Sequence, residues 1–214
     1  MKISSQISSW PMDVWRRTFA RSTRHAARSP SMGMHVSTMP NAPKVISTKE
    51  IYSGRIFRVR IDTVEQDGKR EDVELVVHPG SIAIAALPTD GSIVLIRQYR
   101  HPAGLSLWEI PAGTAEPGED PADGAKRELQ EETGYSAGSW ELLGSLYPTP
   151  GFCTECVHLY AARELRAGPQ QLEQDEHIEV RQVSFQDAWR MQASGEIIDM
   201  KTMVALLWLS KRPA

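Results

Sequence analysis

The chain has 214 residues, of which 41% are hydrophobic and 24% are charged, so it has material for a folded core and a wholly disordered protein is excluded. No stretch approaches the roughly 20 apolar residues that a membrane-spanning helix needs, and a net charge of −3 argues against a polyanion-binding protein. The only two cysteines, Cys153 and Cys156, exclude a disulfide-stapled secreted scaffold and make a reducing, cytoplasmic compartment the expected one.

The first 44 residues form a basic leader. They hold seven basic residues and one acidic residue, a net charge of +6, whereas residues 45–214 hold 17 basic and 26 acidic residues, a net charge of −9. A composition rich in Arg and Ser is typical of an organellar transit peptide. We favour a disordered extension or a start codon assigned too far upstream, with Met32, Met34 and Met39 as alternative starts. One short basic cluster is weak support for a tether, so we expect neither a nucleic-acid nor a membrane partner.

The character of the sequence changes at Val45, and the first strand pattern follows at Arg58. Arg58–Val64 alternates polar and apolar residues, Asp67-Gly68 is a hairpin-turn signal, and Asp72–Val77 fits the returning strand. Residues 45–78 are therefore expected to form a small antiparallel N-terminal sheet. Further strands are predicted over Ser81–Leu87, Ser92–Tyr99, Leu105–Ile110, Trp140–Tyr147, Val157–Ala162 and Ile178–Val183.

Helix patterns follow, and the first has strong signals at both ends. Asp120 is an N-cap candidate before Pro121, and Gly134 stands where a left-handed C-cap belongs. Ser184 is expected to cap a helix over Phe185–Ala193, and Asp199 a final helix over Lys201–Ser210. Many strands with one central and two late helices predict an α/β (α+β) domain over residues 79–214, with a mixed sheet between helices.

The central helix carries three glutamates on one face. Glu128, Glu131 and Glu132 are spaced i, i+3 and i+4, so their carboxylates repel one another unless a cation neutralises them. Oxygen ligands of this kind suit Mg²⁺, with Mn²⁺ as the alternative. The loop over 113–118 can add backbone carbonyls. Charged helix faces are common, however, so the glutamates alone fit a solvated surface with an Arg127–Glu131 pair.

The full spacing separates these two interpretations. Residues 113–135 match Gly-x5-Glu-x7-Arg-Glu-apolar-x-Glu-Glu-x-Gly-apolar, the Nudix box, at every specified position, a coincidence with odds on the order of 10⁻⁷ from average residue usage. The chain therefore resembles the Nudix hydrolase superfamily. The resemblance implies a Nudix-type α/β/α sandwich and Mg²⁺-dependent cleavage of a nucleoside diphosphate linked to another moiety. By motif position it implies these roles: metal ligands Glu128, Glu131, Glu132 and the Ala112 carbonyl, a brace of Glu119 with Arg127, and structural glycines Gly113 and Gly134.

The flanks of the box are similar to the ADP-ribose pyrophosphatase branch. The similar stretches are Arg97–Arg100, Glu109–Gly113, Tyr147–Glu155 with Pro150 about fifteen residues beyond the box, and Gly195–Thr202. This similarity implies hydrolysis of ADP-ribose to AMP and ribose 5-phosphate by a homodimer in which residues 45–77 pack onto the partner. The same box could instead serve GDP-mannose, other ADP-sugars, oxidised nucleotides or a dinucleotide. A non-catalytic nucleotide sensor is a further alternative, although sensors tend to have damaged glutamates and this chain keeps every one.

Four flanking residues are candidates for substrate binding, and three of them have a structural alternative. Arg100 can offer bidentate donors to a diphosphate, or form a surface ion pair. Glu109 can bind the ribose hydroxyls or the purine edge, or brace its loop. Phe57 can stack an adenine, or belong to the core. Glu155 follows a Pro-Gly loop and can face the site.

The general base is left open between the helix and a later loop. Relatives in this branch place an acid in the loop that contains residues 173–176, where it ligates metal or orients the water, and Glu176 is the best match. Where relatives have a second acid two residues earlier, this chain has Gln174, for which Glu173 or Asp175 could substitute. An arginine that many members carry before the His-Pro-Gly turn is missing from Val73–Val77, which weakens the substrate assignment without touching the metal assignment.

Overall fold

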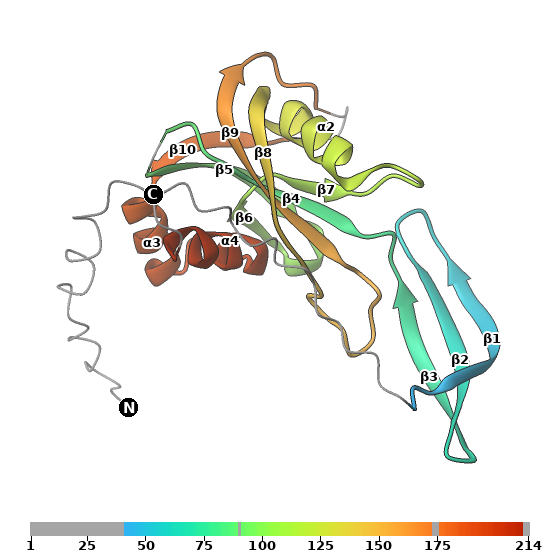
Figure 1. Ribbon diagram of the computed structural model, residues 1–214. Coiled ribbons are helices and arrows are strands. Elements are labelled where there is room, and N and C mark those ends of the chain that lie inside the picture. Colours follow the sequence, from blue (N-terminus) through green and yellow to red (C-terminus); the bar gives the residue numbers. More distant parts are fainter. Residues whose placement is uncertain (1–40, 90, 173–175, 212–214) are drawn as a thin grey trace, which may run out of the picture. The chain divides into compact units, whose positions relative to one another are not determined.

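The computed structural model describes residues 41–89, 91–172 and 176–211, so nearly all of the predicted leader, with Met32, Met34 and Met39, lies outside the described residues. Figure 1 shows the arrangement of the elements. The strands are β1 Lys44–Ser53, β2 Arg58–Gln66, β3 Lys69–Val77, β4 Ser81–Ala86, β5 Ser92–Arg100, β6 Leu105–Glu109, β7 Ala112–Thr114, β8 Tyr135–Leu146, β9 Val157–Ala167 and β10 Glu179–Ser184, and the helices are η1 His101–Ala103, α2 Pro121–Thr133, α3 Phe185–Ser194 and α4 Met200–Ser210. None of the helices in the described part of the chain is both long and apolar enough to cross a membrane.

The N-terminal sheet has the antiparallel order β1-β2-β3. Asp67 and Gly68, with φ of 52° and 75°, form the predicted turn between β2 and β3, because a two-residue hairpin turn of this type needs positive φ at both positions. Strand β1 has no counterpart among the predicted strands. Its pairing with β2 is broken by two register shifts, which disturb the alternation that would reveal it.

Strand β4 lies inside the mixed sheet β7-β4-β9-β8, in which only β4 and β9 run parallel. Ile82 and Ile84 belong to the core that α2 completes, whereas Ala83 and Ala85 belong to the core shared with α3 and α4. Successive side chains of a strand point to opposite faces, so β4 is buried on both sides. Helices cover both faces in Figure 1, which confirms the predicted α/β/α sandwich.

Two features of this fold position the site. The antiparallel sheet β10-β5-β6 places Glu109, the last residue of β6, opposite Ile96, four residues before β5 ends at Arg100. Helix α2 begins at Asp120, whose side chain accepts a hydrogen bond from the Ala122 N–H at 2.8 Å, and ends at Gly134 with φ of 75°. The predicted caps Ser184 and Asp199 likewise begin α3 and α4.

Two C-cap glycines allow a matched test of this packing. Gly134 and Gly195 both have positive φ, so an alanine at either position costs about 1 kcal/mol or more from backbone conformation alone. A Cβ on Gly134 would also overlap the carbonyl oxygen of Gly168, whereas a Cβ on Gly195 would meet open space. We expect Gly134→Ala to lower the free energy of unfolding, measured with urea, clearly more than Gly195→Ala. Equal losses would contradict the close packing of α2 against the segment after β9.

Candidate active site

Arg127 holds the acidic face of α2 together. Its Nε and Nη2 donate to the two oxygens of Glu119 at 2.9 and 3.0 Å, and its Nη1 donates to Glu128 at 2.8 Å and to Glu131 at 2.9 Å. The hydrogen bonds with Glu119 raise the pKa of Arg127 above its ordinary value and lower the pKa of Glu119. The structure thus places Glu119 where the resemblance implies it, as a brace between the loop and the helix.

Glu132 and Glu128 are buried one helical turn apart. Glu132 is only 3% exposed, and its Oε2 accepts a hydrogen bond from the Ala112 N–H at 2.8 Å. Burial raises the pKa of Glu132 to about 8; the Ala112 N–H opposes this rise, while the charges of Glu128 and Glu176 add to it. Burial also raises the pKa of Glu128, although Arg127 opposes it. The surrounding protein therefore offsets only part of the cost of ionising these two side chains.

Strand β7 passes close to both carboxylates. A Cβ on Gly113 would overlap the Glu128 carboxylate, so a residue without a side chain is needed there. The Ala112 N–H points to Glu132, and because the N–H and C=O of one strand residue point to the same side, the Ala112 carbonyl also faces the glutamates. The predicted loop over 113–118 thus begins as strand β7, which fixes the direction of this carbonyl.

Glu176, in the loop before β10, is close enough for its charge to act on the two buried glutamates. Its charge raises the pKa of both Glu128 and Glu132, so acids from two distant segments act on a common space. Glu176 also lines an open hollow of about 530 Å³ together with Tyr99 of β5. The other candidates in this loop, Glu173, Gln174 and Asp175, lie outside the described residues.

The donors beside β7 fit a hard divalent cation. Two carboxylates, Glu128 and Glu132, and one carbonyl, Ala112, are the oxygen ligands that Mg²⁺ and Mn²⁺ accept. A positive charge there would offset the cost of burying Glu132. Within residues 41–89, 91–172 and 176–211, no three His, Cys, Asp or Glu side chains already stand together as a ligand set. Glu128 and Glu131 are paired with Arg127 instead.

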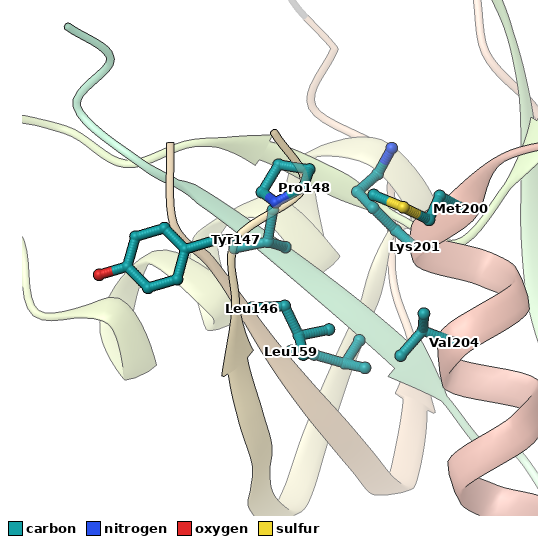
Figure 2. A pocket seen from close by; sticks show the side chains of 8 residues that line it. Leu146, Tyr147, Pro148, Leu159, Met200, Lys201 and Val204 are labelled. Atoms are coloured by element: carbon teal, nitrogen blue, oxygen red, sulfur yellow. The ribbon is translucent and has the colours of Figure 1, made fainter. Parts of the chain in front are cut away.

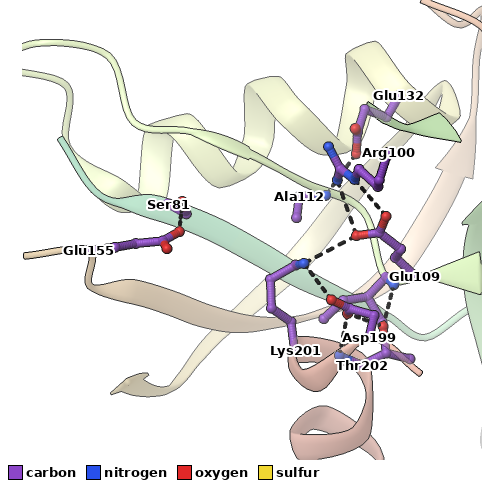
Figure 3. A network of polar contacts seen from close by, with 10 residues as sticks. Ser81, Arg100, Glu109, Ala112, Glu132, Glu155, Asp199, Lys201 and Thr202 are labelled. Carbon is purple, nitrogen blue, oxygen red and sulfur yellow. Dashed lines mark hydrogen bonds and ion pairs between the residues drawn. The ribbon is translucent and has the colours of Figure 1, made fainter. Parts of the chain in front are cut away.

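Arg100 lies near Glu132, at the end of β5 (Figure 3). Its Nε and Nη2 donate to the two oxygens of Glu109 at 2.7 and 3.1 Å, and the Glu132 charge contributes to the raised pKa of Arg100, which burial opposes. Glu109 is 1% exposed, and its Oε2 also accepts a hydrogen bond from Lys201 at 3.1 Å. This geometry favours the bracing alternative for Glu109 over contact with a ribose. The sequence did not single out Lys201 as a site residue. The available signal was Glu109, because a buried glutamate in a strand needs positively charged partners.

Phe57 and Glu155 have partners of their own. Phe57 is 40% exposed and packs against the Tyr52 ring, with 5.8 Å between ring centroids, so the core alternative is wrong and base stacking stays a prediction. Glu155 accepts a hydrogen bond from the Ser81 hydroxyl at 2.5 Å. Figure 3 shows this pair separate from the contacts of Arg100, so the role of Glu155 toward substrate also stays a prediction.

Known proteins resemble this chain in sequence and in fold. The family model described as NUDIX domain matches residues 77–206. An ADP-ribose pyrophosphatase of Bacillus subtilis (strain 168) is 38% identical over 174 residues, which are 80% of this chain and 94% of that protein. A methanol dehydrogenase activator of Bacillus methanolicus has the same identity and coverage. A crystal structure of an ADP compounds hydrolase shares the fold, with a TM-score of 0.70 at 20% identity over 81% of this chain and 95% of that one.

The raised pKa of Glu132 predicts how the stability of the metal-free protein depends on pH. Between the ordinary glutamate pKa and about 8, the folded protein holds a proton at Glu132 that the unfolded chain has lost. Stability from this group is therefore present at low pH and is lost as the pH rises toward 8. With a chelator present, Glu132→Gln should weaken this fall in Tm between about pH 5 and about pH 9 and should melt above the wild type at the alkaline end. The exposed-site control Glu196→Gln should keep the wild-type slope, and a parallel slope in Glu132→Gln would contradict the burial argument.

Proposed function

The chain belongs to the Nudix hydrolase family, and on that basis we propose that it hydrolyses ADP-ribose to AMP and ribose 5-phosphate in a Mg²⁺-dependent reaction. The observation that carries the proposal is the buried pair of Glu128 and Glu132 beside the Ala112 backbone, with the guanidinium of Arg100 near Glu132. A diphosphate presents several anionic oxygens to one site. A site that binds a diphosphate therefore needs both a place for cations and a hydrogen-bond donor from the protein.

The roles of the chain's own residues follow from their surroundings. Glu128, Glu132 and the Ala112 carbonyl hold the cation, with Glu131 at the outer edge of the set. A divalent cation there neutralises charge on a diphosphate and makes a nearby water more acidic. Arg100 uses the donors not bound to Glu109 to hold phosphate oxygens. We assign to Glu176, whose charge acts on both buried carboxylates, the role of accepting the proton from the attacking water.

The choice of ADP-ribose is supported by the names of relatives, whereas the site supports cleavage of a diphosphate. The Bacillus subtilis relative is named an ADP-ribose pyrophosphatase, but the methanol dehydrogenase activator is equally similar. A nucleotide sensor that does not cleave is disfavoured, because the chain keeps every glutamate of the motif and the brace of Glu119 with Arg127. GDP-mannose, other ADP-sugars and oxidised nucleotides remain the competing substrates in the test below.

Two substitutions test the catalytic assignment. Glu128→Gln and Glu132→Gln keep the size of each side chain but remove the charge that holds a cation. Each should lower kcat for ADP-ribose by on the order of 10²-fold or more, with the fold intact by circular dichroism. Glu196→Gln, an exposed glutamate after α3, should leave kcat unchanged.

Product analysis completes this experiment. Reaction in ¹⁸O water, with mass spectrometry of AMP and ribose 5-phosphate, identifies the attacked phosphorus. Persisting activity in Glu132→Gln would refute the site. A larger kcat/KM of the wild type for GDP-mannose or an oxidised nucleoside triphosphate would refute the substrate but leave the site standing.

The N-terminal sheet supports the proposal of a homodimer. It exposes a group of large apolar side chains: Val45, Ile46, Ile51, Tyr52, Ile56, Phe57 and Val73. Many exposed apolar side chains in one small sheet favour an interaction site, and a three-stranded sheet needs a covered face for stability. We propose that residues 45–77 are covered by packing on a second copy of the chain.

A pair of equally exposed residues tests this assignment. Ile51 on β1 and Leu142 on β8 are both 51% exposed, so Ile51→Asp and Leu142→Asp introduce the same charge into similar surroundings. Sedimentation should show that Ile51→Asp shifts the protein toward monomer while Leu142→Asp does not. A wild-type monomer with full activity would overturn the dimer proposal.

A further inference from the structure

A chain of four charged side chains begins at Arg100. Arg100 binds Glu109 through two hydrogen bonds, and Glu109 accepts a third from the Lys201 Nζ at 3.1 Å. The same Nζ donates to the Asp199 Oδ1 at 2.6 Å. The row contains two positive and two negative groups in alternation, and Figure 3 shows it running from the first turn of α4 toward Glu132.

The far end of this row is anchored to the fold. The Asp199 Oδ2 accepts hydrogen bonds from the Thr202 N–H at 2.8 Å and from the Thr202 hydroxyl at 2.7 Å. The Thr202 hydroxyl oxygen in turn accepts a hydrogen bond from the Ile110 N–H at 2.8 Å, and Ile110 directly follows Glu109. The start of α4 is therefore tied to the end of β6 both through Lys201 and through Thr202.

The position of Lys201 is not explained by helix stability. It is the second residue of α4 after the cap, where the positive end of the helix dipole disfavours a cation. Burial also lowers the pKa of Lys201, but Asp199 and Glu109 outweigh this effect and raise the pKa above its ordinary value. The ammonium is thus held charged at this place by its contacts with two carboxylates.

Arg100 depends on the orientation of Glu109. Its side chain is 36% exposed, and only two of its five N–H groups are used by Glu109. The plane of the Glu109 carboxylate therefore decides where the remaining donors point. Lys201 and Arg100 both donate hydrogen bonds to the Glu109 Oε2. Lys201 therefore fixes the plane of this carboxylate, and the negative charge of Glu109 is shared between two cations.

We propose that Lys201 is a positioning residue, which holds Glu109 so that Arg100 directs its free guanidinium edge to the diphosphate of the substrate. This inference rests on the proposed hydrolysis, and it extends the site to the first turn of α4. Lys201 acts through Glu109 and Arg100 and is not assigned any contact with the substrate.

The surroundings of Lys201 allow a clean substitution. Its stem lines a hollow of about 150 Å³ with apolar walls that include Leu146, Leu159 and Val204 (Figure 2). Methionine has a similar length and suits such walls, so Lys201→Met removes the charge while keeping the packing. Lys126→Met is the matched control, because Lys126 pairs with Asp123 at the same 2.6 Å but at an exposed position.

The decisive measurement is a double-mutant cycle on ADP-ribose hydrolysis. Lys201→Met should lower kcat/KM by about tenfold or more, with the same division between kcat and KM as Arg100→Met. The double variant should be no worse than Arg100→Met, because Lys201 has no route to the substrate other than Arg100. Lys201→Arg should recover most of the activity, and Lys126→Met should match the wild type. Losses that multiply in the double variant would overturn the proposal.

A second readout does not need activity. The Arg100 Nε–H signal in a ¹⁵N NMR spectrum, assigned by its absence in Arg100→Lys, should shift or broaden in Lys201→Met and stay in place in Lys126→Met. An unmoved signal in Lys201→Met overturns the proposal. If the wild type cleaves no nucleoside diphosphate, the proposed function fails, while a moved signal would still support the positioning of Arg100.

Discussion

Two carboxylates buried one helical turn apart form the constraint on which the rest of this site depends. A buried charge is costly unless it is paired and hydrogen-bonded, and two like charges on neighbouring turns add to that cost. Glu128 meets Arg127, whereas Glu132 meets the Ala112 N–H and stays at a strongly raised pKa. The cluster therefore depends on the partners that the fold brings to it, which are Arg127 on α2 itself and the Ala112 N–H on β7, while the charge of Arg100 on β5 favours the ionised form of Glu132.

Small residues make that close approach of α2 possible. A Cβ on Gly113 would overlap the Glu128 carboxylate, and a Cβ on Gly124 would overlap the Ile82 side chain of β4. Both glycines are thus needed for packing, one in the strand and one in the helix. A side chain at either position would push α2 away from the sheet or reorient the Glu128 carboxylate. Gly113, the first residue of the motif, and Glu128 therefore belong to one contact.

Local signals in the sequence were enough for the helices, and the motif was enough for the acidic face. Asp120, Ser184 and Asp199 cap the three predicted helices, because capping depends only on neighbours in the chain. Strand β1 was missed because register shifts disturb its alternation, and β7 because three residues are too few to show a period. The contact of Lys201 with Glu109 joins residues 92 positions apart, and only the fold can bring such a pair together.

The two arginines of the site differ in what they can still bind. Arg127 uses Nε, Nη1 and Nη2 on Glu119, Glu128, Glu131 and the Thr114 carbonyl, so its donors are committed to the cluster. Arg100 has committed one side of its guanidinium to Glu109 and keeps donors for an incoming anion. Arg127 therefore shapes the carboxylates, while Arg100 is the cation suited to meet a phosphate. The partner of Arg100 is itself held by α4, so the orientation of Arg100 depends on a helix that is far from the motif in the sequence. In space, Arg100 nevertheless lies near the motif at Glu132.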